Sequence, residues 1–116
     1  IDENGQLIKG KVGKDLDTDS GYNAAKRCAL SIIAQVKKAC DNDLSKVKSC
    51  IKLTGFVNST DDFTEQPKVI DAASELMVTL FGDNGRHTRF AVGVSSLPLG
   101  AVVEIDAIFQ LKKKRL

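Results

Sequence analysis

The chain has 116 residues, of which 42% are hydrophobic and 28% are charged, and its formal net charge is +2. This length and composition fit one globular domain around a single core and exclude two separate cores. The small net charge excludes a strong electrostatic field, so charge alone does not indicate a nucleic-acid partner.

Hydropathy and cysteine usage indicate the compartment. No apolar run approaches the roughly 20 residues that a membrane-spanning helix needs, and no basic segment followed by an apolar one opens the chain. The three cysteines, Cys28, Cys40 and Cys50, cannot all pair within one chain, which favours reduced thiols over a secreted disulfide framework. We therefore expect a cytoplasmic protein with no membrane partner.

The N-terminal part predicts a weak first element and then a helix. Residues 6–13 are short and bounded by glycines, which is typical of an edge strand or a loop. Apolar residues at helical spacing then predict an amphipathic helix over about 20–40, preceded by the possible N-caps Asp17, Asp19 and Ser20.

The middle of the chain predicts a strand and a second helix. Alternation over 47–58 predicts a strand with one buried face, and it places Cys50 on the other, accessible face. A helix is predicted over about 63–81, with Pro67 in its first turn, where proline is tolerated. The Gly-Asp-Asn-Gly sequence at 82–85 ends that helix.

The segment 88–108 predicts a β-hairpin that carries one arginine and two acids among apolar residues. Successive side chains of a strand point to opposite faces, so Arg89 lies beside the small residues Ala91 and Gly93. In the second strand Glu104 shares a face with Asp106. The guanidinium and the carboxylates could then face one cleft; the alternative is that Arg89 only forms an ion pair with an acid at a subunit edge.

The order of elements predicts an α+β fold, with a mixed sheet and two helices packed on one of its faces. The opposite face of the sheet is too polar for a core and is a candidate interface. We expect that face to carry Lys48, Cys50, Lys52, Thr54, Arg89, Ala91, Gly93, Glu104 and Asp106.

The same C-terminal residues carry a family resemblance. Arg89 stands eight positions before the pair Leu97–Pro98, and Glu104 stands seven positions after that leucine, within an Ile-Asp-Ala-Ile ending. This pattern resembles the C-terminal signature of the Rid family, also called YjgF-type and long labelled endoribonuclease L-PSP. The loop Gly85–Arg89 resembles a divergent branch of that family, and the resemblance runs through essentially the whole chain.

The resemblance implies a chorismate-mutase-like fold and a homotrimer. The three sheets of such a trimer form a central barrel, and ligand clefts lie between adjacent subunits. Family members begin with two further strands before the segment that matches Ile1–Gly5, and this single domain, 1–116, lacks them. Losing two strands would expose a long sheet edge, so we expect that the sequence omits an N-terminal part.

The resemblance also implies a chemistry. Many family members hydrolyse reactive enamines and imines, formed from amino acids by pyridoxal-phosphate enzymes, to 2-keto acids and ammonia, and they need no metal or organic cofactor. An arginine at the position of Arg89 holds the substrate carboxylate there, and a glutamate at the position of Glu104 orients or activates water. Backbone groups around Ala91 line the cleft, where many members have cysteine.

Two other functions remain open. The trimer could bind a small carboxylate or regulate a partner without turnover, or it could be an endoribonuclease that inhibits translation. The sequence lacks the histidine pair or aromatic platform that RNA cleavage would lead one to expect, so we do not expect a nucleic-acid partner.

Two further groups of residues have ordinary interpretations beside functional ones. His87 is expected to be a solvated loop residue, and the alternative is a proton donor near the cleft. The run Lys112–Arg115 is expected to be a solvated strand end, and the alternative is a contact to phosphates. No Cys-x-x-Cys or Cys/His cluster indicates a metal site.

Overall fold

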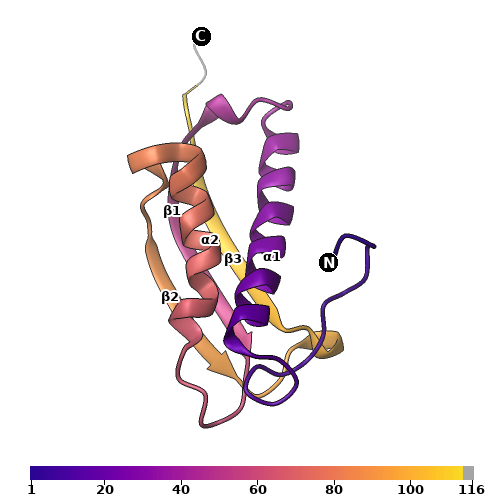
Figure 1. Ribbon diagram of the computed structural model, residues 1–116. Helices are drawn as coiled ribbons and strands as arrows, with labels where there is room; N and C mark the ends of the chain where they lie inside the picture. Colours follow the sequence, from indigo (N-terminus) through magenta and orange to yellow (C-terminus); the bar gives the residue numbers. More distant parts are fainter. Residues whose placement is uncertain (114–116) are drawn as a thin grey trace.

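A computed structural model describes residues 1–113 as two helices packed on one face of a three-stranded sheet (Figure 1). The fold is α+β, as the sequence predicts. Its main elements in chain order are α1 (Thr18–Ala39), β1 (Val47–Asn58), α2 (Gln66–Phe81), β2 (Thr88–Val94) and β3 (Val103–Leu111). Within this part of the chain no helix is both long enough and apolar enough to cross a membrane.

The sheet order is β2-β1-β3, so the prediction of a hairpin between the last two strands is wrong. β1 is the central strand and pairs in parallel with β2 on one side and antiparallel with β3 on the other. The crossover through α2 brings β2 back parallel to β1, as parallel neighbours require. The connection over 95–102, which contains a short 3₁₀ turn at Pro98–Gly100, then carries the chain to the far edge of β1.

Both helices begin and end where local chemistry dictates. Asp17 is the N-cap of α1, and its carboxylate accepts a hydrogen bond of 2.8 Å from the backbone N–H of Ser20. This interaction lowers the pKa of Asp17. α2 starts at Gln66, three residues later than predicted, with Pro67 in its first turn. It ends at Phe81, and its C-cap Gly82 has a φ of 60°, which favours glycine.

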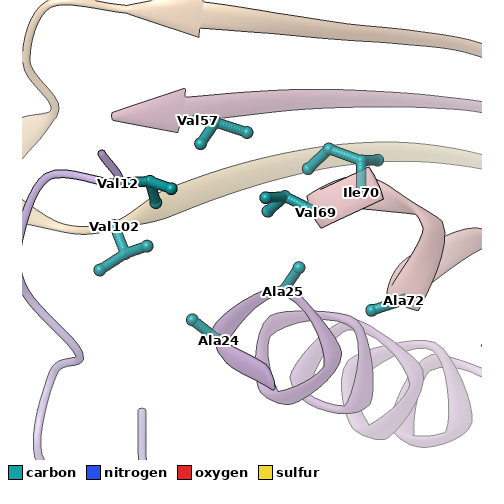
Figure 2. Close-up of a cluster of buried hydrophobic side chains, with 8 residues drawn as sticks. All are labelled: Val12, Ala24, Ala25, Val57, Val69, Ile70, Ala72 and Val102. Carbon is teal, nitrogen blue, oxygen red and sulfur yellow. The ribbon is translucent and has the colours of Figure 1, made fainter. Parts of the chain in front are cut away.

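The core fills the space between the helices and the sheet in two adjoining clusters. Figure 2 shows the first, in which side chains from both helices and from β1 meet two residues of the loops. Its members are Val12, Ala24, Ala25, Val57, Val69, Ile70, Ala72 and Val102. The second contains Ala29, Ile33, Cys50, Leu53, Ala73 and Met77. The segment 6–13 is a loop with isolated bridges, and it delivers Val12 to the core.

The predicted face of Cys50 is wrong because β1 contains register shifts. The ladder with β3 skips one residue between Cys50 and Lys52, so the alternation reverses at this point. Cys50 is 1% exposed in the core and its neighbour Ile51 is 45% exposed. Burial raises the pKa of the Cys50 thiol to about 11. All three cysteines are free, as predicted.

The face of the sheet opposite the helices is open and partly apolar. Phe90 on β2 is 61% exposed, and Ile108 on β3 is 50% exposed. The ammonium of Lys52, from the strand between them, lies 5.5 Å from the centre of the Phe90 ring. This open face carries more exposed apolar surface than scattered single residues would give.

Candidate functional site

Arg89 lies on the face of the sheet that the helices cover, which corrects the prediction that it lies on the open face. In the parallel ladder Arg89 is paired with Leu53, and neighbours paired in this way point to the same side. Leu53 is fully buried beneath the helices. Ala91 and Gly93 follow Arg89 on this face, because they pair with Gly55 and Val57.

The guanidinium of Arg89 is held by two side chains of α2. Its Nη1 donates to Oδ1 of Asp71 at 2.7 Å and to Oγ of Ser74 at 3.2 Å. The side chains of Arg89 and Asp71 are 25% and 46% exposed. Arg89 thus forms an ion pair with an acid, as the alternative interpretation from the sequence expects, but the acid comes from α2 of the same chain; its position at a subunit edge stays a prediction. Glu104 and Asp106 are not the partners.

The hydrogen-bond chain continues from Ser74 to His87. Nε2 of His87 lies 2.9 Å from Oγ of Ser74, and Nδ1 lies 2.6 Å from the carbonyl oxygen of Gly85. The carbonyl can only accept, so Nδ1 donates to it; in the tautomer protonated on Nδ1 alone, Nε2 accepts from the Ser74 hydroxyl. The Ser74 oxygen is then free to accept from Arg89. His87 is half-buried and held on both nitrogens, so its prediction as a solvated loop residue is wrong.

A second acid of α2 lies near this network. Glu75 accepts a hydrogen bond from the hydroxyl of Tyr22, which comes from α1. This bond is the main reason that the pKa of Tyr22 is raised; burial and the negative charges of Glu75 and Asp71 add to it. Asp71 and Glu75 are four residues apart and so lie on one side of the helix, which makes the surroundings of Arg89 acidic.

Glu104 lies on the open face of the sheet. It pairs with Phe56 in the antiparallel ladder and is exposed. Its face therefore differs from that of Leu53 and Arg89. Within one subunit the sheet separates the guanidinium from this carboxylate, so the prediction that the two share one face is wrong.

The backbone around Ala91 is positioned by packing. Its methyl group is partly buried against the first core cluster, so the side chain itself offers no chemistry. β2 is an edge strand, and half of its backbone groups are therefore not used in the ladder with β1. These groups are free to meet a ligand or another strand.

A small polar pocket lies at the C-terminal end of β2. It has a volume of about 260 Å³, and its lining includes Ser59, Gln66 and Gly93. A Cβ on Gly93 would lie 2.6 Å from Nε2 of Gln66, so the end of the Gln66 side chain would have to shift to admit a larger residue. Lys11 fixes this end of the sheet, because its ammonium donates to Oδ1 of Asn58 at 2.8 Å and to the carbonyl of Ser95 at 2.5 Å.

A larger pocket of about 600 Å³ lies between the loop at 13–18 and the segment 62–65. Its lining contains Asp15, Asp17, Asp62 and Glu65 and one lysine. This acidic lining would repel a carboxylate, so we place the candidate site at Arg89 instead.

Two predictions concern ligands other than a carboxylate: a metal ion, and phosphates at the basic C-terminal run. Within residues 1–113 no group of three or more His, Cys, Asp or Glu side chains is placed to hold a metal ion. Lys112 and Lys113 of the basic run are exposed at the end of β3. Lys114 and Arg115 lie outside the described residues, so the role of that run stays a prediction.

Sequence reasoning did not predict Asp71 and Ser74. They fall on the polar side of the second predicted helix, where charged and hydroxyl side chains are ordinary. They could have been predicted from the fact that Arg89 faces the helices. That orientation is known only once β2 is known to pair in parallel with β1.

Comparisons with known proteins place this arrangement among relatives. A family model described as "YjgF/chorismate mutase-like, putative endoribonuclease" matches residues 3–111. The protein TCP17 of Trypanosoma cruzi is 45% identical over 108 residues, which are 92% of this chain and 67% of that protein.

Two solved structures share the fold. A protein of unknown function from Agrobacterium tumefaciens is 48% identical, with a TM-score of 0.92 over 97% of this chain and 72% of that one. A protein from Shewanella oneidensis, described as a "putative endoribonuclease", is 32% identical, with a TM-score of 0.89 over 96% of this chain and 73% of that one. This chain therefore spans about two thirds to three quarters of the length of these relatives.

Proposed function

The chain belongs to the YjgF/chorismate mutase-like family, and from this premise we propose that it hydrolyses reactive enamines and imines of amino acids to 2-keto acids and ammonia. The observation that carries the proposal is the state of Arg89. Its guanidinium is held through Nη1 alone, while Nε and Nη2 have no hydrogen-bond partner among residues 1–113. A planar guanidinium with one free edge is suited to bind a carboxylate through two parallel hydrogen bonds.

The reaction needs a fixed carboxylate and a positioned water. The carboxylate of a 2-imino acid would bind the free edge of Arg89, which fixes the neighbouring imine carbon. Water adds to that carbon, its proton passes to the nitrogen, and the carbon–nitrogen bond then breaks to release ammonia and leave a 2-keto acid. An enamine first tautomerises to the imine. We assign Glu104 as the general base that takes the proton from water.

Arg89 and Glu104 lie on opposite faces of one sheet, so we infer that a site with both residues takes them from two copies of the chain. Two features support an assembly of that kind. β2, which carries Arg89, is an edge strand, and the open face, which carries Glu104, exposes Phe90, Val92 and Ile108. We propose a homotrimer in which the open faces are covered and each cleft lies between neighbouring subunits.

The test is imine loss in a coupled assay. An amino-acid oxidase generates the imine, semicarbazide traps what remains, and wild-type protein is compared with Arg89→Ala. We expect faster imine loss with the wild type only, because the variant cannot hold the carboxylate. Equal loss with the wild type and without protein, across several amino acids, would refute the deaminase proposal. A binding or regulatory trimer would then be the better hypothesis.

Ribonuclease activity is the second candidate, since both the family description and the Shewanella relative carry that term. It predicts RNA cleavage that copurifies with the oligomer and is lost in Arg89→Ala. Cleavage that persists at the wild-type rate in this variant would identify a contaminating nuclease.

A further inference from the structure

The two sides of the Arg89 guanidinium have different surroundings. Nη1 donates to Asp71 and to Ser74, which use both of its hydrogens. Nε and Nη2 form the other edge and have no partner in the described part of the chain. No buried side-chain nitrogen or oxygen there lacks a partner. The unpartnered Nε and Nη2 are therefore not fully buried, on a side chain that is 25% exposed.

From this asymmetry we propose that Asp71 selects ligands by charge: the site accepts 2-oxo and 2-imino acids with one carboxylate and discriminates against those with a second one. The inference rests on the proposed function, because it assumes that Arg89 binds the ligand carboxylate. It adds the substrate class, namely amino-acid derivatives with neutral side chains.

The charges around Arg89 support this selection. The Asp71 carboxylate, 2.7 Å from Nη1, already balances the positive charge of the guanidinium. A first ligand carboxylate still gains two directional hydrogen bonds from the free edge. Two cations of the same subunit are already engaged elsewhere, since Arg86 is paired with Asp83 and Lys68 with Glu65.

Glu75 adds a smaller repulsion of a second ligand carboxylate than Asp71 does. Glu75 lies four residues from Asp71 on α2 and is bound to Tyr22 rather than to a cation. Because Glu75 is exposed, solvent screens its charge, and its repulsion is weaker than that of Asp71. Binding of a dicarboxylate would therefore be weakened by a repulsion that a monocarboxylate does not meet.

Ser74 has a different role, which provides a contrast. Its hydroxyl is held by His87, and His87 is held by the carbonyl of Gly85, so this chain of hydrogen bonds fixes the guanidinium without adding charge. Ser74 is thus a positioning residue. Its loss should weaken all carboxylate ligands equally, whereas the loss of the Asp71 charge should change the preference among them.

The experiment measures the affinities of 2-oxobutyrate and 2-oxoglutarate by isothermal titration calorimetry, which needs no turnover. Wild-type protein should prefer 2-oxobutyrate. Asp71→Asn should raise the relative affinity for 2-oxoglutarate about tenfold, the order expected for removing one partly screened charge at this range. Ser74→Ala should weaken both ligands and leave their ratio unchanged. Glu75→Gln, the matched control on the same side of α2, should change the ratio less than about twofold.

The outcomes separate this inference from the proposed function. An unchanged ratio in Asp71→Asn overturns charge selection, even if the wild type hydrolyses imines. A shifted ratio supports it, even if no imine is hydrolysed, and the protein is then a selective binder. Binding of neither ligand by the wild type overturns the inference. Should Asp71→Asn fail to fold, Asp71→Ser removes the same charge and carries the same expectation.

Discussion

The two faces of the sheet differ in the contacts that fix their side chains. The helices cover one face, and the other face is open. The covered face packs Leu53 and Val57 under the helices, and there Arg89 is fixed by Asp71 and Ser74. The open face carries Glu104 without the support of a helix. One face therefore holds its charged side chain in a defined geometry within a single subunit, and the other carries its acid on an uncovered surface.

Truncation of one apolar side chain on each face gives the sharpest comparison. Leu53→Ala should lower the free energy of unfolding by about 3 kcal/mol at every protein concentration, because it leaves a cavity in the core. Ile108→Ala should cost about 1 kcal/mol or less in the monomer, since this side chain is half exposed. In an oligomer its effect should grow with protein concentration.

Denaturant unfolding at several protein concentrations checks both expectations. A loss for Ile108→Ala as large as that for Leu53→Ala, and independent of concentration, would contradict the difference between the faces.

Thiol reactivity can test which of the neighbours Cys50 and Ile51 lies on the covered face of the sheet. In a background of Cys28→Ala and Cys40→Ala, Cys50 should react with a thiol reagent about 100-fold more slowly than an ordinary cysteine. Burial raises its pKa from 9.0 to about 11 and so removes most of the reactive thiolate. Ile51→Cys, made with Cys50→Ala, is the matched control and should react readily. Similar rates for the two would mean that the register shift in β1 is absent.

Removing the ammonium of Lys11, which links Asn58 to Ser95 at one end of the sheet, should have a moderate effect on the free energy of unfolding. Lys11→Met keeps the length of the side chain but removes the ammonium that links Asn58 to Ser95. We expect a loss of about 1–2 kcal/mol, because partly buried acceptors lose a charged donor. Chemical denaturation measures it. Lys14→Met in the same loop, whose lysine is exposed, should leave the unfolding free energy unchanged.

The N-cap of α1 should have the smallest effect, and it should depend on pH. The pKa of Asp17 is lowered in the folded state by its bonds with Ser20, so its contribution is present above its ordinary pKa and is lost as the pH falls through the lowered value. Wild type should therefore melt at a higher temperature than Asp17→Ala at about pH 6. The difference should shrink towards about pH 3. A difference independent of pH would exclude the charged cap as its source.

The sequence predicted the helices and β1 well because each is defined by a local pattern. The periodicity of α1, Pro67 at the start of α2 and the alternation of β3 all reflect contacts within one element. The layer arrangement followed, since two helices with apolar stripes need a sheet to cover.

Strand pairing could not be predicted in the same way. The Leu-Pro-Leu-Gly connection resembles a hairpin turn locally, yet β3 gains more by pairing with the long buried strand β1. The face of Arg89 is set by the parallel pairing of β2 with β1, which places Arg89 beside Leu53. The ion pair of Arg89 with Asp71 depends on that pairing, and the exchanged positions of Cys50 and Ile51 depend on the register shift in β1. No local sequence pattern indicates the pairing or the shift.

The central claim is that Arg89 and Glu104 meet across subunits, and mixing two inactive variants tests it directly. Arg89→Ala and Glu104→Gln are each purified, shown to lack imine hydrolysis, and then dissociated together and reassembled. If the site takes one residue from each of two copies, random reassembly restores about a quarter of the sites, since half of the subunits supply each intact residue. Recovery of activity near that level is the predicted result. No recovery from mixed oligomers, shown to form by mass spectrometry, would contradict the account.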